Sequence, residues 1–176
     1  MEKRKFTISI FSEDRIGLLH SITIIFTRRN LNIDSLNTSE SETAGVFRFT
    51  VVFTTDLEAA KKVRKQIDKL VDVLGAFLHQ EDDIIHREIA LYKMAISSFY
   101  DGNEVERLLR HHGAQIIRVE KDYLVIEMTG WKEETQALLV ALEPFGITEF
   151  IRSGRIAISK DWTNTHEEVT KLEQHH

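Results

Sequence analysis

Two parts of the chain repeat one order of hydrophobic patterns, and this repetition limits the fold more than any other feature of the sequence. In the first part, Phe6, Ile8 and Ile10 alternate with polar residues, as in a strand with one buried face. An apolar stripe at helical spacing follows, formed by Leu18, Leu19, Ile22, Ile25 and Phe26. Two strands are then expected at 33–42 and 47–53, a helix at 57–70 after the N-cap Asp56, and a strand at 73–79.

The second part predicts the same βαββαβ order. Its expected strands are 89–96, 114–119 and 123–128, its helices are 103–111 and 131–142, and 147–158 forms one long strand or two short ones. We therefore predict an α+β fold with two tandem ferredoxin-like βαββαβ domains, each an antiparallel sheet with helices on one face. The expected domains are 4–80 and 86–160. Residues 81–83 are expected to form a solvated linker, and 161–176 a polar tail.

The alternating strands also predict which faces are covered. The aromatic row of the third strand should face the helices, and it consists of Phe47, Phe49, Val51 and Phe53. One face of each sheet should then be bare. In the second domain, Ile89 and Leu91 alternate with Tyr92 and Met94, so both faces are apolar. Either a contact within the chain or another chain covers such a face, and we favour association into a homodimer or higher oligomer.

Composition narrows the function. The 176 residues carry a net charge of −5, which argues against a nucleic-acid binder. No apolar run approaches the roughly 20 residues of a membrane span, and Thr7 and Ser9 interrupt any signal-peptide core. The chain has no cysteine, and its histidines lack metal-ligand spacing, so we expect no metal site. A cytoplasmic protein is the default expectation.

The turn from Asp14 to Leu19 is the best candidate for a binding site. The first N–H groups of the following helix have no intrahelical partner and attract an anion such as a carboxylate. Gly17 has no Cβ, so a ligand can approach the backbone closely. Asp14 is placed to accept a hydrogen bond from an ammonium group. The alternative is structural: Asp14 as the N-cap of this helix and Gly17 as an ordinary turn residue.

A second polar turn follows the same helix. The side-chain oxygen of Asn32 and the carbonyl of Ile33 are further acceptors for an ammonium group. The apolar residues of the first turn, Ile16, Leu18 and Leu19, favour a short aliphatic side chain on the ligand. Together the two turns predict a site for a free amino acid, which indicates a sensor rather than a catalyst.

The residues also resemble a known family. The segment from Ile8 to Phe53 looks like an ACT domain, a ferredoxin-like amino-acid sensor. Four motifs in order resemble the regulatory small subunit of acetohydroxyacid synthase, also called acetolactate synthase. They are Asn32-Ile33-Asp34-Ser35-Leu36, Leu70-Val71-Asp72-Val73-Leu74, Arg87-Glu88-Ile89-Ala90-Leu91 and Arg152-Ser153-Gly154.

The resemblance implies a subunit without catalysis of its own. It would bind and activate a large catalytic subunit that carries thiamine diphosphate, magnesium and usually FAD, with no cofactor in this chain. It would confer feedback inhibition by a branched-chain amino acid, for which valine is the first candidate. The family's effector contacts fall on Asp14, Gly17 and Leu18 of one chain and on Asn32 and Ile33 of its partner.

This chain departs from the family at the site. Asp14 stands where the family commonly has Asn, and its charge would attract the effector's ammonium group but repel its carboxylate. Leu18 replaces a smaller residue and would narrow the pocket. Two other functions occur on this fold. One is a stand-alone amino-acid-binding regulator of another protein, and the other is a small enzyme such as an acylphosphatase, for which Arg15 is the candidate catalytic residue although the loop around it does not match.

Overall fold

A computed structural model describes residues 2–100 and 103–161, and its contacts divide the chain into two compact units. The first consists of the described residues up to Ile85 together with those from Arg155 onward, and the second is His86–Gly154. Residues 155–160 therefore group with the first unit, although the sequence placed them in the second domain. The predicted tail, 161–176, lies outside the described residues apart from Asp161.

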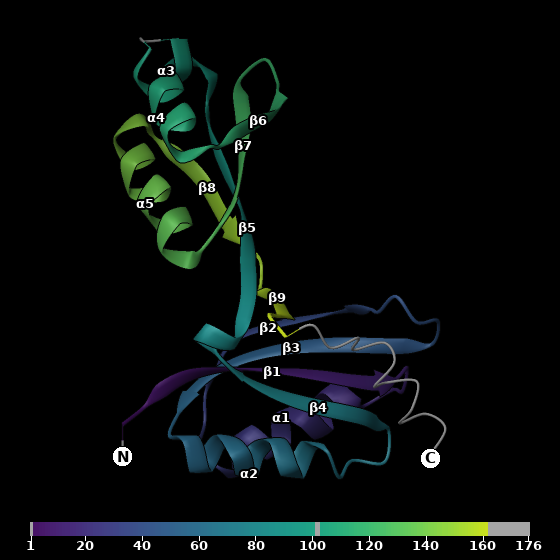
Figure 1. The fold of residues 1–176 in the computed structure, drawn as a ribbon. Helices are drawn as coiled ribbons and strands as arrows, with labels where there is room; N and C mark the ends of the chain where they lie inside the picture. The colour runs from purple at the N-terminus through teal and green to yellow at the C-terminus, as the bar shows by residue number, and fades with distance from the viewer. Residues whose placement is uncertain (1, 101–102, 162–176) are drawn as a thin grey trace. The chain divides into compact units, whose positions relative to one another are not determined.

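The first unit is a four-stranded antiparallel sheet with two helices on one face (Figure 1). Its strand order is β2-β3-β1-β4, which is the ferredoxin-like arrangement predicted for βαββαβ. The elements are β1 (Arg4–Glu13), α1 (Leu18–Arg28), β2 (Ile33–Glu40), β3 (Val46–Thr55), α2 (Leu57–Ile67) and β4 (Val73–Gln80). A short 3-10 helix, η1 (Glu81–Asp83), occupies the predicted linker.

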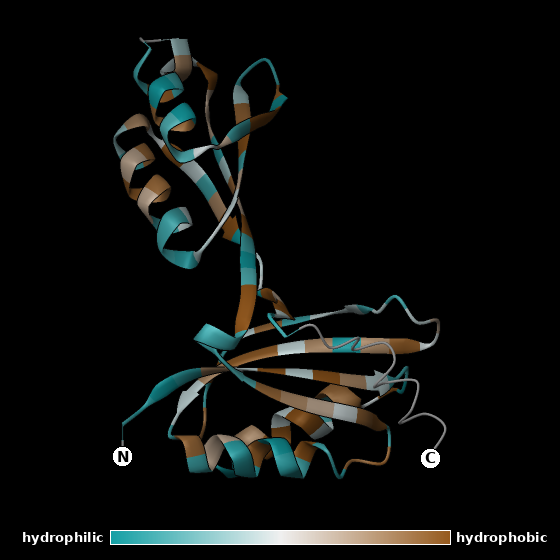
Figure 2. Ribbon diagram, in the orientation of Figure 1, coloured by the Kyte–Doolittle hydropathy of each residue, from teal (hydrophilic) through white to brown (hydrophobic). Residues whose placement is uncertain are grey.

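The core of this unit lies between the sheet and its helices. The aromatic row of β3 faces the helices as predicted, and Phe53 packs edge-on against Phe26 of α1 with ring centroids 5.0 Å apart. The predicted N-cap of α2 is confirmed, because the Asp56 carboxylate accepts a hydrogen bond from the Ala59 N–H at 2.9 Å. Along α2, hydrophilic and hydrophobic residues alternate at helical spacing (Figure 2).

The opposite face of this sheet is not bare, which corrects the sequence-based expectation. Thr7, Ser9 and Phe11 of β1 point away from the helices and are buried. Residues after Gly154 return to this face, where the Arg155 guanidinium contacts Thr7 and an Arg48 Nη donates to the Ala157 carbonyl at 2.5 Å. The C-terminal strand β9 (Ile156–Ser159) forms here and pairs with β5.

The second unit repeats the arrangement, with strand order β6-β7-β5-β8. Its elements are β5 (Ile84–Ala95, beginning in the first unit), α3 (Ile96–Tyr100), α4 (Glu104–His112), β6 (Gln115–Val119), β7 (Tyr123–Gly130), α5 (Lys132–Leu142), η2 (Glu143–Phe145) and β8 (Ile147–Arg152). The prediction that Ile96 ends a strand is wrong: Ile96 begins α3 and packs against the core on the helix side. The segment predicted as one or two strands, 147–158, forms two.

The two faces of the second sheet differ. Ala90, Tyr92 and Met94 are fully buried against the helices. On the other face Ile89 and Ile151 are 42% and 62% exposed. This apolar face is the observation behind the predicted association between chains, which stays a prediction. Among the described residues, no helix has the length and apolarity that crossing a membrane requires.

Candidate functional site

The turn between β1 and α1 presents an uncapped helix N-terminus. Gly17 occupies the N-cap position with φ 90° and ψ −6°, a left-handed conformation that glycine adopts without steric cost. Within the described part of the chain, no side chain caps this helix, so Asp14 is not its N-cap and the structural alternative for Asp14 fails. Asp14 and Gly17 are both exposed.

The first turn of α1 is therefore suited to an anion. The Leu18 N–H donates to the Arg15 carbonyl at 3.4 Å, and the Ser21 N–H donates to the Gly17 carbonyl at 3.1 Å. The N–H groups of Leu19 and His20 lie between these two bonds and have no intrahelical acceptor, as in the first turn of any α-helix. The first turn carries no acidic residue, so nothing in it opposes a bound carboxylate.

The apolar residues of this turn point in different directions. The side chain of Leu18 is buried in the core of the first unit, whereas Ile16 is fully exposed and Leu19 is 42% exposed. Ile16 and Leu19 are thus the two apolar side chains of the turn that a ligand can meet from solvent.

The second polar turn leads into β2. Asn30, just after the C-cap of α1, adopts φ 53°, a left-handed conformation that asparagine tolerates at a helix end. Asn32 is exposed and Ile33 is half-buried. The pairing of β2 with β3 shifts register between Ile33 and Ser35, and the Thr54 hydroxyl donates to the Asp34 carboxylate at 2.8 Å. The backbone that carries Asn32 and Ile33 therefore leads directly into a β-bulge.

One chain does not bring the two turns together. Ile33 pairs with Phe53, and Phe53 pairs with Phe6 near the start of β1. The first turn follows Glu13, seven residues further along β1, which is about 23 Å away at the usual rise of a strand. This distance exceeds the span between the ammonium and carboxylate groups of one amino acid, so the two halves cannot hold the same molecule within one chain.

Arg15 is not well placed to bind an anion. Its Nε lies 3.1 Å from a Glu13 carboxylate oxygen and 3.9 Å from an Asp72 carboxylate oxygen. Two neighbouring carboxylates oppose a bound phosphate, which disfavours the acylphosphatase alternative. Among the residues that the structure describes, no group of three or more His, Asp or Glu side chains is arranged to hold a metal ion.

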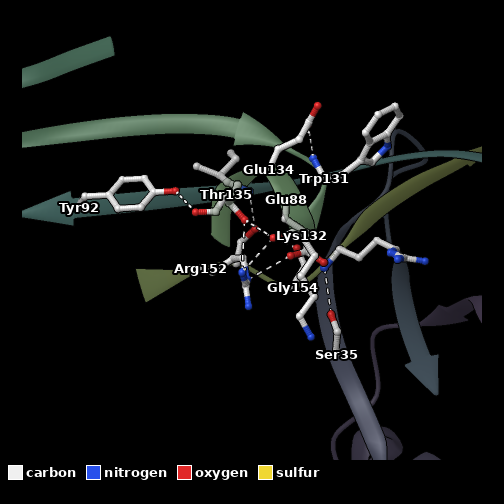
Figure 3. Close-up of polar contacts among 12 residues, drawn as sticks. Ser35, Glu88, Tyr92, Trp131, Lys132, Glu134, Thr135, Arg152 and Gly154 are labelled. Carbon is white, nitrogen blue, oxygen red and sulfur yellow. Dashed lines mark hydrogen bonds and ion pairs between the residues drawn. The ribbon is translucent and has the colours of Figure 1, made fainter. Parts of the chain in front are cut away.

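The second unit contains a buried polar network around Arg152 (Figure 3). The Arg152 Nε lies 3.2 Å from a Glu88 carboxylate oxygen, and both side chains are largely buried. One Nη also donates to the Thr135 hydroxyl at 3.3 Å. Thr135 in turn accepts a 2.6 Å hydrogen bond at its carbonyl from the Tyr92 hydroxyl. Glu88 and Arg152 belong to the motifs named above, and the structure shows that they pair within this unit.

Burial raises the pKa of Tyr92 to about 12 from an ordinary value of 10.0, and the nearby Arg152 opposes this only in part. Because the folded state disfavours the phenolate, the stability that Tyr92 contributes is present below pH 10 and is lost as the pH rises from 10 through 12. We expect an ultraviolet titration of the chain to show a late tyrosine ionisation that Tyr92→Phe removes. If Tyr92→Phe and the wild type showed the same tyrosine ionisation at high pH, this expectation would be contradicted.

Sequence reasoning missed Arg155, which directly follows the Arg152-Ser153-Gly154 motif. It is 3% exposed, and its guanidinium contacts both carboxylate oxygens of Glu81, at 2.5 and 3.3 Å, and the Thr7 hydroxyl at 3.0 Å. Its backbone N–H donates to the Ser35 hydroxyl at 3.0 Å. Its position beside a motif is the one signal in the sequence that points to it.

Two family models match the chain. One, described as an AHAS small subunit-like ACT domain, matches residues 8–75, and the other, described as the small subunit of acetolactate synthase, matches residues 87–161. The chain is 33% identical to the acetolactate synthase small subunit of Mycolicibacterium smegmatis over 154 residues, which cover 88% of this chain and 90% of that protein. It is 33% identical to the Bacillus subtilis small subunit over 159 residues, covering 90% and 91%.

A solved structure agrees. The crystal structure of the acetolactate synthase small subunit from Thermotoga maritima matches with a TM-score of 0.81 and 27% identity, over 91% of this chain and 99% of that one. The fold thus agrees with that small subunit over nearly the whole of both chains. The chain belongs to the family of acetolactate synthase small subunits.

Proposed function

We propose that this chain is a regulatory subunit that activates the catalytic large subunit of acetolactate synthase. It also transmits feedback inhibition by a branched-chain amino acid, for which valine is the first candidate. The observation that carries the proposal is the uncapped N-terminus of α1 in a chain that matches small subunits along both units. Thiamine diphosphate, magnesium and FAD belong to the catalytic subunit in this proposal, and this chain contributes no cofactor site.

The effector site is completed by a second copy. Because the two polar turns lie about 23 Å apart in one chain, the α1 N-terminus of one copy meets Asn32 and Ile33 of its partner. A two-fold pair places each half against the other half twice, which gives two identical sites per dimer. The α1 amides take the effector's carboxylate. Asp14, the Asn32 amide oxygen and the Ile33 carbonyl accept from its ammonium group.

The side chains of the first turn favour a small aliphatic effector. Leu19 and Ile16 are the exposed apolar side chains beside the amides, and no exposed polar group of the turn other than Asp14 and Arg15 offers a partner for a polar side chain. Feedback then follows from linkage: an effector that binds one state of the assembly better shifts its population by at most the difference in affinity. A coupling of about 1–3 kcal/mol changes the response about 5- to 150-fold.

The direct test is to mix the purified chain with its cognate catalytic subunit and measure acetolactate formation. We expect a complex on gel filtration, a higher rate than the catalytic subunit alone, and inhibition of that rate on titration with valine. Leucine and isoleucine titrations serve as matched comparisons of side-chain size. Valine binding without a complex or a change in rate would instead support a stand-alone amino-acid-binding regulator.

A further inference from the structure

The four residues Arg152–Arg155 are anchored at both ends. At the first end, Arg152 pairs with Glu88, and Ser153 exchanges two hydrogen bonds with Ile89, one from its N–H at 2.8 Å and one to its hydroxyl at 2.9 Å. These contacts lie within the second unit. At the other end, the hydrogen bonds of Arg155 to described residues are with Thr7, Ser35 and Glu81 of the first unit.

The anchor at Arg155 is deeply buried. Its guanidinium bridges Thr7 of β1 and Glu81 of η1, and its backbone N–H donates to the Ser35 hydroxyl of β2. A nearly buried guanidinium that pairs with a carboxylate resists displacement, because its separation leaves a charge in a poorly solvated site. Arg155 therefore fixes the start of the returning chain to three elements of the first unit.

Ser35 joins this anchor to the proposed effector site. It stands two residues after Ile33 and three after Asn32, at the end of the β-bulge where β2 shifts register against β3. A bulge leaves one residue unpaired and disrupts the ladder locally, so fewer ladder hydrogen bonds fix the backbone there. A ligand that binds at Asn32 and Ile33 thus acts on a short, irregular segment, which the Thr54–Asp34 and Arg155–Ser35 hydrogen bonds hold.

We propose that the Ser35–Arg155 hydrogen bond transmits effector occupancy from the start of β2 to the Arg152–Arg155 segment, and through it to the second unit. This inference rests on the proposed function and specifies how its feedback is transmitted. In this mechanism the effector favours one of two arrangements of the bulge. The segment then carries the change because both its ends are held.

The test is hydrogen exchange with mass spectrometry on the full chain, with and without valine, for the wild type, Ser35→Ala and the control Ser39→Ala. Ser39 lies on the same strand and is exposed, beyond the bulge and the Arg155 contact. In the wild type and in Ser39→Ala, valine should slow exchange about five-fold or more both in α1 and in residues 150–156. In Ser35→Ala, the slowing in α1 should persist while that in 150–156 is lost.

The same variants are then assayed with the catalytic subunit. Ser35→Ala should bind valine with an affinity within about two-fold of the wild type and activate the enzyme normally, but show at least about five-fold weaker inhibition. Protection of 150–156 that survives in Ser35→Ala, or full inhibition of its complex, would overturn the inference and leave the proposed function standing. A wild-type chain that no branched-chain amino acid protects anywhere would overturn both.

Discussion

Gly17→Asp is expected to reduce the affinity for valine by at least about 100-fold. The added carboxylate would lie at the N-terminus of α1, where the effector's own carboxylate is proposed to bind. Two like charges about 4 Å apart repel by about 4 kcal/mol at the effective dielectric of a protein surface, and the helix dipole would already be neutralised in part. Isothermal titration calorimetry of the purified chain measures this loss directly.

Two control variants separate charge from backbone strain. Gly17→Asn has nearly the same shape without the charge, and both side chains tolerate a positive φ better than most. It should therefore lose much less affinity than Gly17→Asp. Gly146→Asp makes the same substitution at φ 80° in the second unit, where an added Cβ also meets nothing within 4 Å. Valine affinity unchanged in Gly17→Asp would refute the placement of the site.

A mixing experiment tests whether the site joins two chains. Asn32→Ala removes the amide from the other half, and Asn32 is exposed, so the fold should tolerate the change. In a mixed dimer with Gly17→Asp, one of the two sites carries both substitutions and the other carries neither. Random exchange of chains between the two variants would give wild-type affinity to about a quarter of the sites. No recovery of binding after the two variants exchange would argue against a shared site.

The parts of the fold that follow from local periodicity could be predicted from the sequence. The βαββαβ order, the aromatic row of β3 and the Asp56 cap each depend on patterns within about a dozen residues. The return of the chain to the first unit could not. In β9 the large side chains Ile156 and Ile158 are exposed and the small Ala157 faces the sheet, the reverse of what hydrophobic alternation predicts.

The candidate site was predictable only in its separate halves. Sequence reasoning identified the turn at Gly17 and the turn at Asn32, and the structure shows that the first is an uncapped helix N-terminus. Sequence reasoning could not show that the two turns lie at opposite ends of one sheet, since that depends on the register of β1, β2 and β3. Arg155 escaped notice because a charged residue in a sequence gives no sign of being buried beside Glu81.

Arg152→Met should destabilise the second unit by about 3–5 kcal/mol, the usual cost of removing one partner from a buried ion pair. Methionine fills much of the volume of the arginine side chain, so the loss comes from Glu88, whose side chain is 8% exposed and would keep a charge without its cation. Thr135 would also lose a hydrogen-bond donor. Urea unfolding followed by circular dichroism measures the change.

The matched control lies on α4 of the same unit, where Arg110 pairs with Glu106 in an exposed i, i+4 ion pair. Arg110→Met should cost less than about 1 kcal/mol, because water solvates the carboxylate that remains. Adding Glu88→Gln to Arg152→Met should recover part of the loss, since a neutral amide is less costly to bury than an unpaired carboxylate. Equal losses of stability in Arg152→Met and Arg110→Met would mean that burial does not determine how much the Glu88–Arg152 pair contributes to stability.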